Sequence, residues 1–218
     1  MAQIAIIGGN GRIARHLIAS LKAAGHTPLA LVRNTDHAAE LEGLGAKVGL
    51  LDIENSTDGD FGAALAGSDA VVFAAGGGGD GNIERKRTVD FEGSVKAIAG
   101  AKVAGISRFV QISAMSVDKP VAADAGEVWT AYVEAKRDAD TALRASELDW
   151  TIIRPGALTD DEPTGHISLS NEADRGQIPR ADVAALLTAI LVDDRTIGKQ
   201  WEAVTGDTVI SDAISAAV

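Results

Sequence analysis

The sequence contains no cysteine among its 218 residues, and aromatic side chains make up only 4% of it. Without cysteine, the chain has no disulfide, no thiol nucleophile and no thiolate metal site. Histidines are also few, and none stand at the spacing of metal ligands, so we expect no zinc or iron centre. These histidines are His16, His26, His37 and His166.

Long apolar runs and an excess of basic residues are also lacking. The apolar stretch Val183–Val192 is too short to span a bilayer, and the N-terminus lacks the basic and apolar regions of a signal peptide. With 20 basic and 31 acidic residues, the net charge of −11 argues against nucleic acid or membrane as a partner. We expect a cytoplasmic protein that acts on a small-molecule substrate, with its oligomeric state left open.

Short apolar segments alternate with longer amphipathic segments along the chain. The short segments favour strands buried on both faces, and the longer ones favour helices. The predicted strands are Gln3–Ile7, Thr27–Val32, Ala46–Leu51, Ala70–Ala74, Arg108–Ile112, Trp150–Ile153 and Gln200–Val204. The predicted helices are Arg12–Ala24, Asp36–Leu44, Phe61–Ala66, Asp90–Ala104, Glu127–Ser146 and Ala181–Val192. This alternation predicts an α/β fold with a Rossmann-type doubly wound parallel sheet.

A single domain is expected to cover residues 1–218, because no linker or repeat divides the chain. The regular alternation loosens after Pro155, and residues 156–180 contain one short predicted strand, His166–Leu169. We expect residues 156–180 and the C-terminal segment to form a small substrate-facing lobe.

A glycine-rich turn joins the first predicted strand to the first predicted helix. It reads Gly8-x-x-Gly11-x-x-Ala14. Gly8 permits the tight turn, Gly11 lets a pyrophosphate approach the backbone, and Ala14 allows close packing of helix on strand. The helix N-terminus offers N–H groups and a positive dipole to phosphates. The turn therefore predicts a bound dinucleotide, with further contacts from Asn10, Arg12 and Ile13.

The residue at the end of the second strand indicates which dinucleotide is bound. Folds that bind NAD usually place Asp or Glu there, where the carboxylate bonds the ribose hydroxyls. This chain has Arg33 instead, which suits a 2′-phosphate, and Arg12 is placed to assist it. We predict that NADP(H) is preferred over NAD(H).

Further cofactor contacts follow from the topology, because ligands lie at the carboxyl ends of parallel strands. Asp52 and Ile53 follow the third predicted strand and are expected to flank the adenine. The glycine-rich run Gly76–Gly81 is expected to be a mobile flap, since no Gly-Lys-Ser/Thr follows it. The small residues expected beside the ribose after the fourth strand are Ala74, Ala75 and Gly76.

Candidate catalytic residues follow the fifth predicted strand. Tyr132 is the only tyrosine in the chain, and Lys136 stands four residues later on the same predicted helix face. A cationic Lys136 and a nearby nicotinamide would favour the phenolate and lower the pKa of the phenol, so that Tyr132 could exchange a proton with a substrate oxygen. Lys136 would also bond the cofactor ribose, and Ser113 would orient the substrate oxygen. The alternative is that Tyr132 simply packs with Trp129.

The order of these motifs resembles that of short-chain dehydrogenase/reductases. The closer resemblance is to their atypical NAD(P)H-binding branch, which includes flavin/biliverdin reductase-like proteins, NmrA-like sensors and bacterial proteins labelled as sugar epimerases. Its most specific signature is Leu-Asp-Trp-Thr-Ile-Ile-Arg-Pro-Gly, residues 148–156, and the similarity continues at residues 180–184 and 197–199. The resemblance implies a Rossmann fold with Pro155 and Gly156 near the nicotinamide.

Three functions remain open at this point. The first is an NADP-dependent oxidoreductase for a small carbonyl or a flavin, although few aromatic residues are present to stack a flavin. The second is a sugar epimerase or dehydratase, for which the region after Pro155 is short. The third is a redox sensor that binds NADP(H) without turnover.

Overall fold

The computed structural model describes residues 1–79 and 81–218. Within these residues, nine strands form one sheet in the order β3-β2-β1-β4-β5-β6-β10-β8-β11. The strands from β3 to β10 are parallel, and β8 and β11 are added in antiparallel pairing. The strand bounds are β1 Gln3–Ile7, β2 Thr27–Val32, β3 Lys47–Leu50, β4 Ala70–Phe73, β5 Arg108–Ile112, β6 Asp149–Pro155, β8 His166–Ser170, β10 Lys199–Thr205 and β11 Thr208–Val209. A separate small sheet pairs β7 Ala157–Thr159 with β9 Gln177–Pro179.

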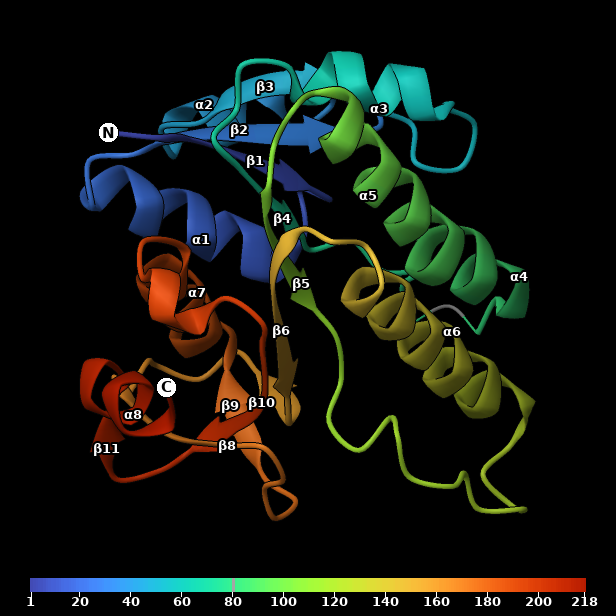
Figure 1. Cartoon of the computed structure of the whole chain (residues 1–218), viewed down its shortest axis with the longest axis vertical. Helices are drawn as coiled ribbons and strands as arrows, with labels where there is room; N and C mark the ends of the chain where they lie inside the picture. The colour runs from blue at the N-terminus through green and yellow to red at the C-terminus, as the bar shows by residue number, and fades with distance from the viewer. Residues whose placement is uncertain (80) are drawn as a thin grey trace.

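Helices cover both faces of the large sheet (Figure 1). The helix bounds are α1 Arg12–Ala23, α2 Ala38–Gly43, α3 Asp58–Leu65, α4 Ile83–Arg85, α5 Gly93–Val103, α6 Glu127–Arg144, α7 Arg180–Leu191 and α8 Ile210–Ala217, with a π-helix η1 at Lys86–Glu92 and a 3-10 turn η2 at Asp194–Thr196. One apolar cluster joins α1 and α7 to the sheet, through side chains such as Leu17 and Leu187. A second cluster joins α3, α5 and α6 to the opposite face, through Phe61 and Leu143.

The central strands are buried on both faces because helices pack against each face of the sheet. Every residue of β4 and β5 is buried, although β5 includes Arg108 and Gln111. The sequences of such strands are continuous apolar runs rather than alternating patterns, and these continuous runs predict the strands. The predicted α/β Rossmann-type fold is confirmed, and its carboxyl strand ends meet at one edge of the sheet.

The predicted elements match the structure within a few residues, with instructive exceptions. The helix predicted at Asp90–Ala104 begins earlier, at Ile83, and its first part includes a π-helical segment. The short strands β7, β9 and β11 and the helix α8 were not predicted. They lie in or after the region expected to form a substrate-facing lobe, and that role stays a prediction.

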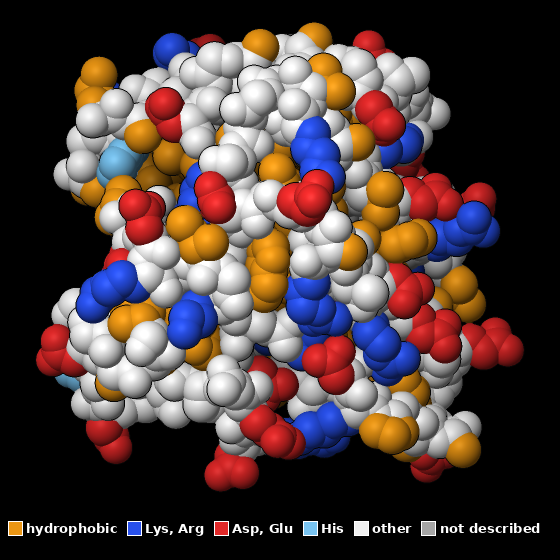
Figure 2. Space-filling model, in the orientation of Figure 1, with side chains coloured by type: hydrophobic (Ala, Val, Ile, Leu, Met, Phe, Trp, Pro, Cys, Tyr) orange, Lys and Arg blue, Asp and Glu red, His pale blue; other side chains and the backbone are white. Residues whose placement is uncertain are grey.

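Charges on the surface are mixed rather than separated. In the face seen in Figure 2, acidic and basic side chains lie next to one another. Several are paired, as in the contacts of Arg12 and Arg180 with Asp160. Among the described residues, no helix is both long enough and apolar enough to cross a membrane.

Candidate active site

The glycine turn between β1 and α1 requires glycine at two positions. At Gly8 both the backbone conformation and the lack of space exclude a side chain, and at Gly9 the lack of space does. Gly8 has φ +84°, and a Cβ built on it would lie 2.8 Å from the Cα of Ala75. Gly9, which was not among the predicted cofactor contacts, is held equally closely, since a Cβ built on it would lie 2.7 Å from the Cβ of Ala30. Gly11 is the N-cap of α1 and offers no side chain to cap the first turn. The amides of that turn are therefore left for another acceptor.

A cavity of about 430 Å³ opens directly beside this turn, at the carboxyl ends of β1 to β4. Many of the predicted cofactor contacts line it. They are Gly8, Asn10, Gly11, Arg33, Asp52, Ile53, Ala74, Ala75 and Gly76. The structure thus brings together residues spread over the first third of the chain, as expected where parallel strands end at a topological switch point.

The β2 end of this cavity is rich in nitrogen donors. Arg33, Asn34 and His37 all line it, and Arg33 is exposed. The pKa of Asp52 is lowered mainly by the hydrogen bond from Asn55, and the Arg33 charge lowers it further. Asn34 and His37 were not predicted from the sequence. They lie beyond the strand, where no spacing rule indicates which loop residues turn towards the cavity.

Five predicted cofactor residues lie outside the lining of this cavity: Arg12, Ile13, Lys136, Pro155 and Gly156. Arg12 donates to Asp160 at 2.7 Å and so faces the C-terminal part of the chain. Ile13 belongs to the apolar core under α1. The Cβ of a side chain at Gly156 would lie 2.4 Å from the carbonyl oxygen of Gly176, so packing against that residue already requires glycine.

Lys136 lies buried between the end of β5 and the π-helix. Its Nζ is 3.0 Å from Oδ1 of Asp90 and donates to the carbonyl oxygen of Ile112 at 3.3 Å. Burial, the largest single effect, lowers the pKa of Lys136, but Asp90, Tyr132 and Asp140 together outweigh it and the pKa is raised. Oδ2 of Asp90 accepts the Gly77 amide at 2.8 Å. One carboxylate therefore connects α6 to the glycine segment after β4.

Tyr132 lies one turn before Lys136 and lines a second cavity, of about 500 Å³. Its ring packs against Trp129 at a centroid distance of 5.5 Å, and the Nζ of Lys86 lies 5.8 Å from the ring centroid. Burial raises the pKa of the Tyr132 phenol, Lys136 lowers it, and Asp90 and Asp140 raise it again. The expected effect of Lys136 is present, but among the groups of the chain burial is the larger effect, so the pKa of the phenol is raised. The lowering expected from Lys136 and a nicotinamide together stays a prediction.

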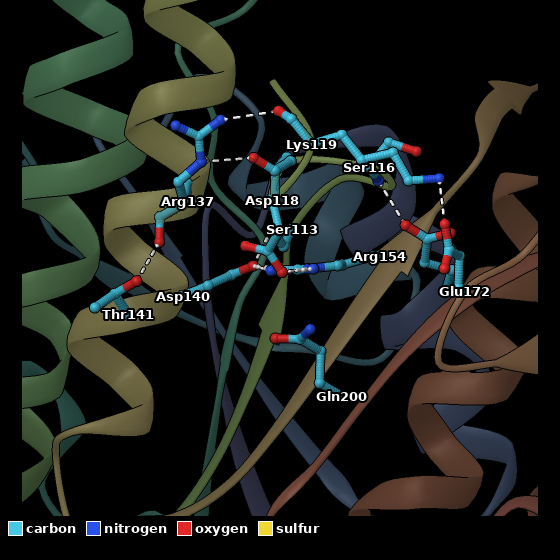
Figure 3. Close-up of polar contacts among 12 residues, drawn as sticks. Ser113, Ser116, Asp118, Lys119, Arg137, Asp140, Thr141, Arg154, Glu172 and Gln200 are labelled. Atoms are coloured by element: carbon cyan, nitrogen blue, oxygen red, sulfur yellow. Dashed lines mark hydrogen bonds and ion pairs between the residues drawn. The ribbon is translucent and has the colours of Figure 1, made fainter. Parts of the chain in front are cut away.

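Ser113 follows β5 and is engaged with a buried carboxylate. Its Oγ donates to Oδ2 of Asp140 at 2.8 Å, and Asp140 also accepts from Gln111 and twice from Arg154. Figure 3 shows Arg154 reaching Asp140 from the neighbouring strand. Burial raises the pKa of Asp140, while Arg154 and the bonds from Ser113 and Gln111 lower it. The Ser113 hydroxyl proton is therefore engaged by Asp140, and Ser113 is buried and is not in the lining of either cavity.

The loop after β5 is held by contacts from several elements (Figure 3). Arg154 donates to Asp118 at 2.6 Å, and Glu202 of β10 accepts the Ser116 amide at 2.6 Å. The other Glu202 oxygen accepts the Ala173 amide at 2.9 Å, so the same carboxylate also holds the segment after β8. This bonding fixes the loop beside Ser113 in place.

The residues around the first cavity fit a dinucleotide by their own geometry. The glycine cradle would be filled by a Cβ at Gly8, and the adjacent helix begins with uncapped amides that suit phosphates. No group of three His, Asp or Glu side chains that could hold a metal ion occurs among residues 1–79 and 81–218. The predicted flap Gly76–Gly81 includes Asp80, which lies outside the described residues.

Two buried carboxylates beside Lys136 and Ser113 were not among the site residues predicted from the sequence. Asp140 continues the four-residue spacing of Tyr132 and Lys136, so it lies on the same face of α6, and that spacing could have found it. Asp90 gave no such signal. It approaches Lys136 from η1, which precedes α5, and only the tertiary packing of η1 on α6 brings the two together.

The comparisons with known proteins agree with this geometry. Residues 8–194 match the model of the NAD(P)H-binding family. The chain is 36% identical to the uncharacterized sugar epimerase YhfK of Bacillus subtilis, over 97% of this chain and 98% of that protein. It superposes with a TM-score of 0.91 on a candidate NAD-dependent epimerase/dehydratase of Bacillus halodurans, at 36% identity over 99% of this chain and all of that one.

A further solved structure is less similar in sequence but has the same fold. The oxidoreductase ylbE of Lactococcus lactis superposes with a TM-score of 0.86, at 29% identity over 98% of this chain and 95% of that one. The family match covers most of the chain, including the glycine turn, both cavities and α6. The chain therefore belongs to the NAD(P)H-binding family and has the Rossmann fold typical of short-chain dehydrogenase/reductases.

Proposed function

We propose that this protein is an NADP(H)-dependent oxidoreductase that reduces a small carbonyl substrate. The observation that carries the proposal is the placement of α6. This helix holds Lys136 against the end of β5, beside Ser113, while Tyr132 lines a separate cavity one turn earlier. A proton donor next to a cavity, with a fixed charge behind it, is the arrangement that carbonyl reduction requires.

The dinucleotide would be held in the first cavity. Its pyrophosphate fits the Gly8–Gly11 turn, and Asp52 and Ile53 fit the adenine end. Arg33 supports a preference for NADP(H), because a guanidinium beside a 2′-phosphate forms paired, charge-assisted hydrogen bonds. Asn34 and His37 add further donors beside Arg33. When bound in its reduced form, the cofactor supplies a hydride.

The chain's own residues then manage the proton. The Tyr132 phenol, with its raised pKa, is protonated at neutral pH and can donate its proton to the substrate oxygen. Lys136 stabilises the phenolate that is left, and solvent returns the proton. Hydride and proton together convert the carbonyl to an alcohol. At neutral pH the raised pKa keeps Tyr132 in the protonated form that reduction requires.

The Tyr132→Phe variant tests this proposal. NADPH oxidation is followed by its absorbance with a panel of aldehydes and ketones, for wild type and variant. Loss of the proton donor is expected to lower kcat by about 10²- to 10⁴-fold. NADPH affinity should stay the same, because Tyr132 does not line the first cavity. Equal turnover by the two proteins would refute the proton-donor role.

The names of the Bacillus relatives suggest a second candidate, sugar epimerisation. An epimerase returns the hydride to its own substrate, so it keeps its cofactor through many turnovers. Protein purified with non-exchanging NAD(P) would favour this candidate. Free exchange of NADP⁺ and NADPH would favour the reductase.

A further inference from the structure

We propose that the second cavity is the substrate site and that it takes a planar, largely apolar carbonyl compound. The inference rests on the proposed reductase function and adds the substrate class to it. The cavity has a volume of about 500 Å³, within the usual range for a site that takes a small molecule. Tyr132, the proposed proton donor, is one of its walls.

The walls of this cavity are mainly apolar. Its lining includes the side chains of Ala125, Val128, Trp129 and Tyr132, together with the backbone of glycines before α4 and before α6. Glycines leave a flat wall without side chains. A planar ligand packs well between such a wall and aromatic rings.

Trp129 is the feature that indicates a planar ligand. Its side chain contacts Tyr132, yet the residue remains 53% exposed in the first turn of α6. Neighbouring Val128 is also exposed, at 39%. Two exposed apolar residues at the mouth of a cavity next to the proposed proton donor offer a surface that an apolar ligand would cover.

The charged groups of the cavity do not suit a sugar. Lys86 is buried, donates to the carbonyl oxygen of Gly78 and faces the Tyr132 ring, so its ammonium is already engaged. Glu127 is the other charged residue in the lining. A sugar brings many hydroxyl groups, and each one that loses water without gaining a hydrogen bond weakens binding. The lining offers few side-chain partners for them.

The test compares naphthaldehyde, which is planar and apolar, with glyceraldehyde, which is small and polar. NADPH-linked turnover of both is measured for wild type, Trp129→Ala and Trp129→Phe, and naphthaldehyde binding is measured calorimetrically without cofactor. Val192→Ala is the matched control, because Val192 is an exposed apolar residue outside the cavity. Wild type should prefer naphthaldehyde. Trp129→Ala should weaken naphthaldehyde binding and lower kcat/KM for naphthaldehyde, each by about tenfold. Trp129→Phe should restore most of this loss, and Val192→Ala should match wild type.

The outcomes separate this inference from the proposed function. Turnover of naphthaldehyde that depends on Tyr132 but is unchanged in Trp129→Ala would overturn the apolar substrate site and leave the reductase standing. Naphthaldehyde binding that needs Trp129, with turnover unchanged in Tyr132→Phe, would support the cavity assignment and refute the proton-donor role. A preference for glyceraldehyde in wild type would also overturn the inference.

Discussion

The Lys136 ammonium lies 3.0 Å from a carboxylate oxygen of Asp90, and both side chains are almost completely buried. The second oxygen of Asp90 accepts the Gly77 amide. Asp90 belongs to a π-helical segment, a form that often occurs at functional sites. The charge of Asp90 therefore acts on both Lys136 and Tyr132, and it raises the pKa of each.

Replacing Asp90 by Asn should move the pH profile of the reaction. The substitution removes a negative charge that raises the pKa of Tyr132, so the phenol ionises at a lower pH. Because reduction requires the protonated phenol, we expect the basic limb of kcat/KM to shift to lower pH. Asp138→Asn is the control, since Asp138 is exposed on α6, the helix that carries Tyr132 and Lys136. A basic limb that stays in place or moves up would contradict the assigned coupling.

Asp140 is expected to contribute strongly to stability. It is fully buried and accepts hydrogen bonds from Ser113, Gln111 and Arg154. Asp140→Ala leaves the buried Arg154 with Asp118 as its remaining carboxylate partner, and it should lower the free energy of unfolding by about 3–5 kcal/mol. Urea denaturation measures this difference. Asp138→Ala should stay within about 0.5 kcal/mol of wild type, as expected for an exposed position.

Gly8→Ala tests the glycine cradle, and the chain offers a matched comparison. Gly8 and Gly67 have φ of +84° and +77°, but a Cβ at Gly67 would meet no atom within 4 Å. Gly67→Ala should therefore cost only the strain of the left-handed backbone, about 1–2 kcal/mol. Gly8→Ala adds the clash with Ala75, so it should be less stable than Gly67→Ala and should lose NADPH binding. Equal stability and intact binding would show that the cradle tolerates a side chain.

The buried Arg108 gives a prediction far from the site. Its guanidinium donates to the side chains of Thr151 and Thr196 and to two carbonyl oxygens, which ties β5 to β6 and α7. Burial lowers the pKa of this arginine. Arg108→Ala removes these four hydrogen bonds, although the Ile190 carbonyl oxygen still accepts from Thr196, and it should cost about 3 kcal/mol or more in thermal or urea unfolding. Turnover of the protein that remains folded should be unchanged, and a large loss in kcat would contradict a purely structural role.

The sequence predicted those parts of the molecule that local patterns and topology control. The strand before Gly8 and the strand before Arg33 were recognisable because both are short apolar runs followed by turn residues, and parallel topology then placed their ends together. The contact of Lys136 with Asp90 was not predictable, since no spacing rule links η1 to α6. Strands as short as β7 and β9 leave no periodic pattern, and the pKa of Tyr132 depends on burial that only the folded chain defines.

Calorimetric binding of NADPH and NADH tests the central claim most directly, with Arg33→Asp as the paired variant. The account predicts that wild type binds NADPH more tightly than NADH by about tenfold or more, from the charge-assisted bonds of Arg33 to the 2′-phosphate. It also predicts that Arg33→Asp reduces or reverses this preference while leaving the fold intact. Tighter binding of NADH by wild type, or binding of neither dinucleotide, would contradict the account.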